Sequence, residues 1–433
     1  MSDRPTGFLG LSHLGIISSI GWASLGTRVV AVDLDREAVD QLRRGELPVH
    51  EPSLPELFEA TRGRMTFSTD PAALTECDLV VVSRDIPTDA EDGSDPSVVD
   101  RLIEGAIPHL RAGSTLVLMS QVSPGATRAL AARIESLRPG AGIGVYYWVE
   151  TLIFGNAVER FLKPERIIVG AADPVRPLPG PLELGLRRFG CPILPMGYES
   201  AELTKTAINL YLFGAVTYAN TLSDLCEAVG ANWSEMVPAL RLDRRIGPAA
   251  YIRPGLGVAG GNLERDLVTL RGLGQRHDVD VAYVDTLLAH NARRYRWVQR
   301  QLERGRVLDP GGRAVVAVWG LAYKKNTRST KNSMALRIIE NLRGRAEVRA
   351  YDPVVRAHDV DVAATLVETR DAALVGADCL LILTDWDEFT TPPAAGFQAM
   401  RRRMVIDCVG ALGAARQDLL GVEYVAMGRP VPR

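Results

Sequence analysis

The stretch from Gly7 to Asp35, "GFLGLSHLGIISSIGWASLGTRVVAVDLD", joins two apolar runs through a glycine turn and a helical pattern. "GFLGL" predicts a strand, "GIISSIGWASLG" predicts a helix that ends at a glycine cap, and "RVVAVDLD" predicts the next strand. A strand, a crossover helix and a second strand in this order form the unit of a doubly wound parallel sheet. The stretch therefore predicts an α/β fold.

The glycine turn "GLSHLG" has the spacing of a dinucleotide-binding fingerprint, and Asp33 ends the next strand about 20 residues further on. The helix that follows the turn offers amide donors to a pyrophosphate, and an acid accepts hydrogen bonds from ribose hydroxyls. The acid favours NAD over NADP, because it repels a 2′-phosphate. We predict NAD contacts at Gly10, Ser12, Leu14, Gly15 and Asp33. Ser12 replaces the second glycine of the fingerprint, and a turn without a cofactor is the alternative.

Further apolar runs, "CDLVVVS" and "STLVLMS", are typical of strands that crossover helices bury on both faces. A proline-rich segment near residues 172–185 loosens this pattern, and the chain from Glu199 to Gly305 is strongly helical. After "DPGGR" a second α/β alternation begins. The pattern predicts two Rossmann-like, doubly wound parallel-sheet domains, residues 1–195 and 306–433, joined by a central helical domain, residues 196–305.

Composition excludes several classes of function. The net charge of −2 offers no basic field for nucleic acid or for an anionic membrane surface. No apolar run approaches the ~20 residues that span a bilayer, and the N-terminus lacks the pattern of a secretory signal. Five scattered cysteines without CxxC spacing predict reduced thiols and no metal site. We therefore expect a cytoplasmic protein without a nucleic-acid or membrane partner.

Twelve collinear stretches carry a resemblance over nearly the whole chain. They are "GLSHLG…VVAVDLD", "GELPVHEPSLPELF", "IPTDAEDGSDPSVV", "SQVSPGATR", "FGNAVERFLKPERIIVG", "AELTKTAINLYL", "LCEAVGA", "LDRRIG", "GLGVAGGNLERDL", "GLAYKKNTRSTKNS", "YDP" and "TDWDEF". In them the chain resembles the UDP-glucose/GDP-mannose dehydrogenases. The resemblance implies an NAD domain, a central domain that dimerises and a C-terminal nucleotide-sugar domain. It also implies oxidation of a sugar CH2OH to a carboxylate with two NAD+.

The resemblance implies a set of catalytic residues. Lys205 matches a lysine that stabilises the alkoxide of the first hydride transfer, and only five of the 50 basic residues are lysine. Asn209 lies four residues later on the same helical face. Asp266 matches an aspartate that holds a catalytic water, although a helix N-cap is the alternative. Glu150 matches the glutamate that assists thioester hydrolysis, but Trp148 and Val149 replace its usual neighbours.

The chain departs from the family at several implied site positions. Asn262 occupies the position of the cysteine that captures the aldehyde, and a carboxamide is not a nucleophile. Ile86 replaces a threonine expected near the nicotinamide. Lys331 replaces a sugar-binding arginine, which exchanges a planar donor for a point charge. Arg328 and Ser329 replace two aspartates.

The resemblance implies further contacts with the cofactor, the nucleotide sugar and a second subunit. Ser120 and Lys324 are expected at the cofactor, and Gly257 and Lys331 at the nucleotide sugar. Arg245 in "LDRRIG" matches an arginine that reaches the partner subunit's substrate site, which predicts a homodimer through the central domain. A surface arginine without that role is the alternative.

Three hypotheses for function remain open. The leading one is a single two-electron oxidation of a nucleotide sugar, or a redox-neutral oxidation and re-reduction, because the residues of the first hydride transfer are kept and the nucleophile of the second is lost. The second is a full four-electron oxidation through the aldehyde hydrate. The third is an inactive paralogue that binds NAD or a nucleotide sugar, which Ser12 and Ile86 favour. The base, the sugar and the pathway stay undetermined.

Overall fold

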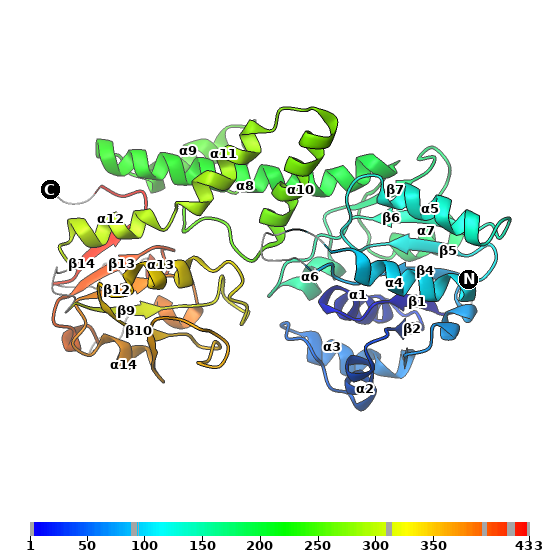
Figure 1. Cartoon of the computed structure of the whole chain (residues 1–433), viewed down its shortest axis with the longest axis horizontal. Helices are drawn as coiled ribbons and strands as arrows, with labels where there is room; N and C mark the ends of the chain where they lie inside the picture. The colour runs from blue at the N-terminus through cyan, green and yellow to red at the C-terminus, as the bar shows by residue number, and fades with distance from the viewer. Residues whose placement is uncertain are drawn as a thin grey trace. The chain divides into compact units, whose positions relative to one another are not determined.

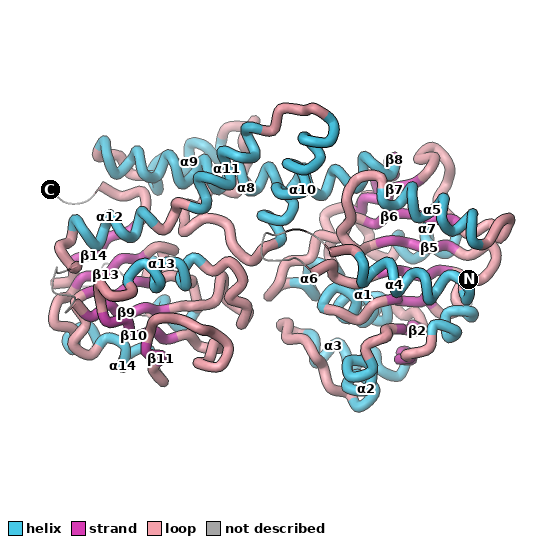
Figure 2. The backbone as a smooth tube through the Cα atoms, in the orientation of Figure 1, coloured by secondary structure: helices cyan, strands magenta, loops and turns pink. Residues whose placement is uncertain are grey.

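The computed structural model describes residues 4–87, 93, 95–308, 314–391, 396–413 and 421–430. Residues 88–92 and 94, inside the motif "IPTDAEDGSDPSVV", lie outside the described residues. The chain divides into two compact units, Met1–Ile208 and Asn209–Arg433, and in each unit Figure 2 shows strands flanked by helices. In the described part of the chain, no helix is both long and apolar enough to cross a bilayer.

The described residues of unit 1 form one eight-stranded sheet in the order β3-β2-β1-β4-β5-β6-β7-β8. The strands are β1 (Thr6–Leu9), β2 (Val29–Val32), β3 (Met65–Ser68), β4 (Leu79–Val82), β5 (Thr115–Leu118), β6 (Gly144–Trp148), β7 (Ile167–Ala171) and β8 (Ile193–Gly197). The helices are α1 (His13–Ser24), α2 (Arg36–Arg44), α3 (Leu54–Thr61), α4 (Ser97–Ala106), α5 (Ala126–Leu137), α6 (Ala157–Leu162) and α7 (Gly180–Arg187).

Side chains of neighbouring strand residues enter different cores. Phe8, Ala31 and Val81 belong to one cluster, which also takes apolar residues of α1, α2, α3, α6 and α7. Leu9 and Val32 belong to a second cluster, with residues of α4 and α5. This alternation follows from the two-residue period of a strand. The sheet is therefore covered by helices on both faces, as the continuous apolar runs predicted.

The sheet of unit 1 has one antiparallel pair. All other neighbours pair in parallel, but β6 and β7 are antiparallel, with Tyr147 opposite Gly170. The apolar run "VYYWVETLIFG" thus supplies a strand only as far as Trp148, and the chain then enters a loop. The predicted doubly wound fold is confirmed, with this departure at the β6–β7 step.

The described residues of unit 2 form a parallel six-stranded sheet and a set of helices (Figure 1). Its strand order is β11-β10-β9-β12-β13-β14. The strands are β9 (Val315–Trp319), β10 (Glu347–Tyr351), β11 (Thr365–Leu366), β12 (Cys379–Ile382), β13 (Met404–Asp407) and β14 (Glu423–Ala426). The helices are α9 (Trp233–Leu242), α10 (Asn262–His277), α11 (Ala282–Ala292), α12 (Arg296–Arg304), α13 (Met334–Leu342) and α14 (Arg370–Leu374).

Helix α8 (Tyr198–Val229) is continuous over 32 residues, and the boundary between the two units falls within it. Figure 1 shows it as one unbroken helix. It lies at the start of the stretch that the sequence predicted to be strongly helical. The division of the chain into domains at 195 and 305 stays a prediction, because the two compact units separate at residue 208.

Candidate functional site

The glycine turn of unit 1 lies where the strand order reverses. β1 has β2 on one side and β4 on the other, so the loops after β1 and β4 meet at a switch point, the usual place for a ligand in such sheets. Gly10 has φ +99°, and a Cβ on Gly15 would lie 1.8 Å from Gly10 O. Both positions therefore require glycine, and they bring the start of α1 against the end of β1.

Asp33 is buried at the end of β2, with 3% of its surface exposed. Its Oδ2 accepts a hydrogen bond from Leu11 N at 2.5 Å, and its Oδ1 accepts one from Asp35 N at 2.9 Å. Arg84, from the loop after β4, forms an ion pair with the same carboxylate at 2.9 Å. The sequence interpretation placed Asp33 correctly beside the glycine turn but missed Arg84.

The first turn of α1 is also bonded to the loop after β4. Asp85 N donates to Ser12 Oγ at 2.7 Å, and Leu14 N donates to Asp85 Oδ2 at 2.9 Å. Ser12 in place of glycine thus gives this loop an acceptor. Asp85 was not predicted, because nothing in the pattern links it to a helix 71 residues earlier.

The hydroxyl of Ser120, two residues past β5, is fully buried and has no hydrogen-bond partner among the described residues. An unsatisfied buried hydroxyl is costly and is expected to gain a partner when a ligand binds. The tight glycine turn, the buried acid and this hydroxyl fit a dinucleotide at the switch point of unit 1. The residues that would hold it are the predicted Gly10, Gly15, Asp33 and Ser120.

Glu150 and Lys205 form an ion pair in unit 1. Lys205 Nζ lies 2.8 Å from Glu150 Oε1, and the two side chains are 10% and 15% exposed. Lys205 Nζ also donates to the carbonyl oxygen of Glu150 at 3.0 Å, while Leu152 N donates to Glu150 Oε2 at 2.8 Å. The loop after β6 thus presents a carboxylate to the lysine of α8. The two residues that the resemblance singled out in this unit are in contact.

Asn209 and Asp266 form a second pair, within unit 2. Asn209 Nδ2 donates to Asp266 Oδ2, and Arg265 Nε donates to Oδ1 at 3.4 Å. Asp266 is 1% exposed and Arg265 is 7% exposed. A buried carboxylate is stable only when it is paired and hydrogen-bonded, and these two donors meet that need. Arg265 was not predicted, although it stands beside Asp266 in the motif.

Helix α10 begins at Asn262, one turn before Asp266. Gly261 is its N-cap, with φ +89°, and Gly261 N donates to Glu264 Oε2 at 3.2 Å. The alternative role of Asp266 as a helix N-cap is therefore wrong, because Asp266 lies inside the helix. Asn262 occupies the first helical position, and its side chain is exposed.

The glycines before Asn262 make room for two side chains of the C-terminal half of unit 2. A Cβ on Gly260 would lie 2.6 Å from the ring of Tyr323, and one on Gly261 would lie 2.9 Å from Lys331 Cε. The Nζ of Lys324 lies 5.5 Å from the centre of the Tyr323 ring. Lys331 is thus next to Gly261, the N-cap of the helix that begins at Asn262. Its contact with a substrate stays a prediction.

Gly257 and Arg245 have other surroundings in unit 2. A Cβ on Gly257 would lie 2.2 Å from Asn291 Oδ1, an atom that accepts from Val258 N at 2.7 Å. This close packing accounts for the glycine without a ligand. The side chain of Arg245 is 89% exposed and pairs with Asp243 at 2.7 Å. The substrate roles assigned to these residues stay predictions.

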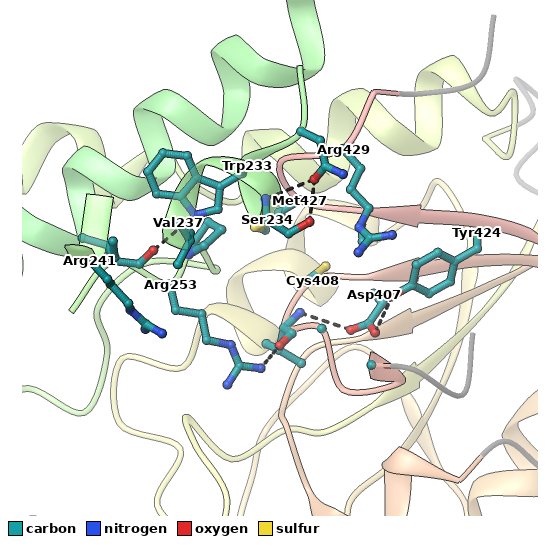
Figure 3. Close-up of a pocket in the computed structure, with 17 residues that line it drawn as sticks. Trp233, Ser234, Val237, Arg241, Arg253, Asp407, Cys408, Tyr424, Met427 and Arg429 are labelled. Atoms are coloured by element: carbon teal, nitrogen blue, oxygen red, sulfur yellow. Dashed lines mark hydrogen bonds between the residues drawn. The ribbon is translucent and has the colours of Figure 1, made fainter. Parts of the chain in front are cut away.

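A cavity in unit 2 lies apart from the residues predicted for the site. This cavity, of about 370 Å³, is lined by the first turn of α9 and by the ends of β13 and β14. Figure 3 shows Trp233, Arg253 and Tyr424 around it, and the buried Asp407 accepts from Tyr424 Oη at 2.8 Å. No group of three or more histidine, cysteine or acidic side chains among the described residues could hold a metal ion.

Three family models match consecutive parts of the chain. The NAD binding domain of the UDP-glucose/GDP-mannose dehydrogenase family matches residues 6–177, its central domain matches residues 199–293, and its UDP binding domain matches residues 317–414. These matches cover most of the chain and follow the order expected from the sequence motifs.

Known relatives extend over nearly the whole length. The chain is 30% identical to a UDP-glucose 6-dehydrogenase of Rhizobium meliloti (strain 1021), over 98% of this chain and 99% of the relative. It is 32% identical to a UDP-glucose 6-dehydrogenase of Haloferax volcanii, over 92% and 95%. The solved UDP-glucose dehydrogenase of Pyrobaculum islandicum superposes with a TM-score of 0.83 at 27% identity, over 98% and 97%.

The glycine turn with its buried acid, the lysine–glutamate pair and the buried aspartate therefore stand in a chain whose three parts all match one family. Its cofactor is NAD, as the sequence predicted. The chain belongs to the UDP-glucose/GDP-mannose dehydrogenase family, whose members are NAD-dependent nucleotide-sugar dehydrogenases that act on CH–OH groups.

Proposed function

We propose that this chain oxidises a CH–OH group of a nucleotide sugar once, by two electrons, and releases a carbonyl product. The observation that carries the proposal is Asn262 at the first position of α10, where a covalent second oxidation requires a thiol. Lys205 and Asp266, to which the resemblance assigns the first hydride transfer, are both present in the chain.

In the proposed oxidation, Lys205 stabilises the negative charge on the substrate oxygen. NAD+ supplies the hydride acceptor when it is bound. As the hydroxyl proton is removed, negative charge develops on the substrate oxygen, and an ammonium in a site with little water stabilises this alkoxide. The charge on oxygen falls again as the C=O bond forms and the hydride leaves carbon. The Lys205 side chain is 10% exposed, and Glu150 at 2.8 Å orients it and balances its charge.

We assign to Asp266 the role of the base that accepts the proton of the substrate hydroxyl. Its carboxylate is held by Asn209 and by Arg265, so its orientation is set before a substrate arrives. A carboxylate fixed in this way accepts the hydroxyl proton, either directly or through one water molecule. Asn209 contributes by positioning the acid.

The state of the five cysteines supports a single oxidation without a second, thiol-dependent one. Burial raises the pKa of all five thiols, to about 12 at Cys77, whereas a nucleophilic cysteine needs a lowered pKa. None of them replaces the thiol that is missing at Asn262, so an aldehyde has no covalent acceptor among the cysteines. This favours release of the first oxidation product.

The match of residues 317–414 to a UDP binding domain supports a UDP-sugar as the substrate. The test is to incubate the purified chain with NAD+ and a panel of UDP-, GDP- and dTDP-sugars, and to count NADH formed per sugar consumed. One NADH per sugar, together with a carbonyl product that a hydrazine traps, is the expected result. Two NADH with a carboxylate product contradict the proposal. Sugar interconversion without net NADH, or binding without conversion, contradicts it as well.

A homodimer is the second part of the proposal. Tyr211, Tyr218, Leu225 and Val229 of α8 are 65%, 45%, 53% and 75% exposed. The first three repeat every seven residues, so they lie along one side of the helix, as in helices that pack against a partner helix. Exposed apolar side chains gathered in this way mark an interaction surface. We assign the surface to a second copy of this chain.

A further inference from the structure

The loop that follows β4 lies directly on the glycine turn of unit 1. A Cβ on Gly10 would lie 2.7 Å from Arg84 Cβ and 2.9 Å from Arg84 N. Ser83 Oγ donates to Gly10 O at 3.2 Å, and Asp85 N donates to Ser12 Oγ at 2.7 Å. Both neighbours of Arg84 are thus anchored to the turn, and its backbone position is fixed at the switch point.

From this position the Arg84 side chain reaches the acid at the end of β2. Its Nη1 lies 2.9 Å from Asp33 Oδ2, and the two side chains are 25% and 4% exposed. Leu11 N and Asp35 N also donate to the Asp33 carboxylate. Both oxygens of the acid are therefore bonded within unit 1, and its negative charge is balanced by a guanidinium.

This pairing changes what Asp33 does to a cofactor. An unpaired acid here selects NAD, because it accepts from the ribose hydroxyls and repels a 2′-phosphate. A guanidinium at the acid cancels most of that repulsion, and arginine is the residue that accommodates a 2′-phosphate through paired N–H donors. We propose that Arg84 sets the cofactor specificity, so that the adenosine site accepts NADP(H) as well as NAD(H).

The inference rests on the NAD-binding assignment of unit 1 and is independent of how many hydrides leave the sugar. Arg84 competes with a ribose for Asp33 when the ribose carries only hydroxyls, and it contacts the ligand when the ribose carries a phosphate. The arginine therefore affects the two cofactors differently. Asp33 alone would leave NADP strongly disfavoured.

The test uses two probes that differ only in the 2′-phosphate, adenosine 2′,5′-bisphosphate and 5′-AMP, titrated into the full-length chain by calorimetry. The wild type is expected to bind the bisphosphate at least as tightly as 5′-AMP. In Arg84→Gln, the bisphosphate is expected to bind at least about tenfold more weakly, since one charge-assisted contact is lost, while 5′-AMP changes less than about threefold. Arg84→Lys should retain part of the bisphosphate affinity, because it keeps the charge.

Arg36→Gln is the matched control, because Arg36 is an exposed arginine three residues after Asp33. A loss of bisphosphate affinity in Arg36→Gln in place of Arg84→Gln overturns the proposal. So does an equal weakening of both probes by Arg84→Gln. A wild type that binds the bisphosphate about tenfold more weakly than 5′-AMP overturns it without any variant. The titration needs no sugar and no turnover, so it stands apart from the test of the proposed oxidation.

Discussion

At the scale of single residues, the proposed single oxidation depends on Asn262. It is the first residue of α10, after the N-cap Gly261. The positive end of the helix dipole lowers the pKa of a thiol at such a position. We therefore expect Asn262→Cys to form a second NADH per sugar and to accumulate a carboxylate product. Asn262→Ser, which lacks a thiol, is the control, and a ratio that stays at one in Asn262→Cys would count against the assignment of this position.

Lys205 is the residue to which we assign the stabilisation of the alkoxide in the proposed oxidation. Lys205→Met keeps an unbranched side chain that is one atom shorter, and it removes the charge 2.8 Å from Glu150. We expect the rate of NADH formation to fall by about 10²–10³-fold, the usual effect of losing one preorganised charge at a developing oxyanion. Lys163→Met, at an exposed lysine of the same unit, is the control and should retain the wild-type rate. Equal rates in the two variants would exclude Lys205 from catalysis.

Some of these residues were predictable and others were not. Gly10, Gly15 and Asp33 have fixed spacings along the chain, and Lys205 and Asp266 stand in motifs, so the sequence alone locates them. Arg84 pairs with an acid 51 residues away, and Asp85 bonds to a helix 71 residues away. Contacts at such separations leave no periodic signal. One hint of their role was visible in the sequence, because Arg84 and Asp85 are two charged residues between the apolar strand β4 and Pro87.

At the scale of elements, the loop between β6 and α6 is held by one buried acid. Glu51, 1% exposed, accepts from Gly155 N at 2.8 Å, from Ala157 N at 3.1 Å and from His13 Nε2 at 2.8 Å. This loop also carries Glu150, so an acid about a hundred residues earlier in the chain helps to hold the loop in place. The run "VYYWVETLIFG" resembles a strand throughout because its apolar residues continue into the loop. The strand ends at Trp148, and Glu51 holds the chain further on, at Gly155 and Ala157.

Glu51→Gln tests this anchor. Burial raises the pKa of Glu51, but the hydrogen bonds from His13, Gly155 and Ala157 outweigh it and lower the pKa overall. A lowered pKa in the folded state gives stability that is present above the unfolded pKa and is lost as the pH falls through the folded pKa. We expect Glu51→Gln to lower the free energy of unfolding by about 1–3 kcal/mol at pH 7, with a smaller difference below pH ~4. Urea unfolding of Glu51→Gln and of the exposed control Glu56→Gln measures it, and a difference that grows on acidification would refute this account.

Helix α8 carries the prediction about assembly. The double variant Tyr218→Glu/Leu225→Glu places two charges among exposed apolar side chains that repeat every seven residues. Burying an unpaired charge in an interface costs several kcal/mol, so we expect the molar mass measured by light scattering to fall from a dimer to a monomer. Val375→Glu, at an exposed apolar residue of the C-terminal sheet region (56% exposed), is the control and should remain a dimer. A wild-type monomer at micromolar concentration would refute the assignment.

At the scale of the whole molecule, the two sheets use the same turn. Gly10 follows β1 and Gly320 follows β9, the strands at which the strand order of each sheet reverses. The two glycines have φ +99° and +98°. Leu11 N donates to Asp33 at 2.5 Å in unit 1, and Leu321 N donates to Asp352 at 2.8 Å in unit 2. The two sheets therefore share a local design that their sequences, with little in common beyond a glycine and a distant acid, hardly reveal.

The difference between the two turns lies in the helix that follows. Helix α1 begins at His13, three residues after Gly10, whereas α13 begins at Met334, fourteen residues after Gly320. Unit 1 thus brings a helix N-terminus and its amide donors to the glycine turn, as a dinucleotide requires. In unit 2 the segment with Tyr323, Lys324 and Lys331 takes that place. This agrees with the separate matches of the two regions to an NAD binding domain and a UDP binding domain.

The shared turn makes a prediction about each unit separately. A Cβ on Gly10 would lie 2.9 Å from Arg84 N, and one on Gly320 would lie 2.8 Å from Thr384 N. Gly113 also has a positive φ, +75°, but has nothing within 4 Å of an added Cβ. Gly113→Ala should therefore lower the free energy of unfolding only by the ~1–2 kcal/mol that backbone strain costs. Gly10→Ala and Gly320→Ala should lower it by about 1–3 kcal/mol more, because the added Cβ clashes with its neighbours.

Hydrogen exchange resolved by peptide can locate these losses. Gly10→Ala should raise exchange in β1, β2 and β4, and Gly320→Ala should raise it in β9, β10 and β12. The nearest contacts of each added Cβ, Arg84 and Thr384, lie in the loop that follows a neighbouring strand of the same sheet. Gly113→Ala should change neither set beyond its own loop. If Gly10→Ala were no more harmful than Gly113→Ala, the contact with Arg84 would be too loose to hold that arginine over Asp33, and the cofactor specificity proposed for Arg84 would lose its structural basis.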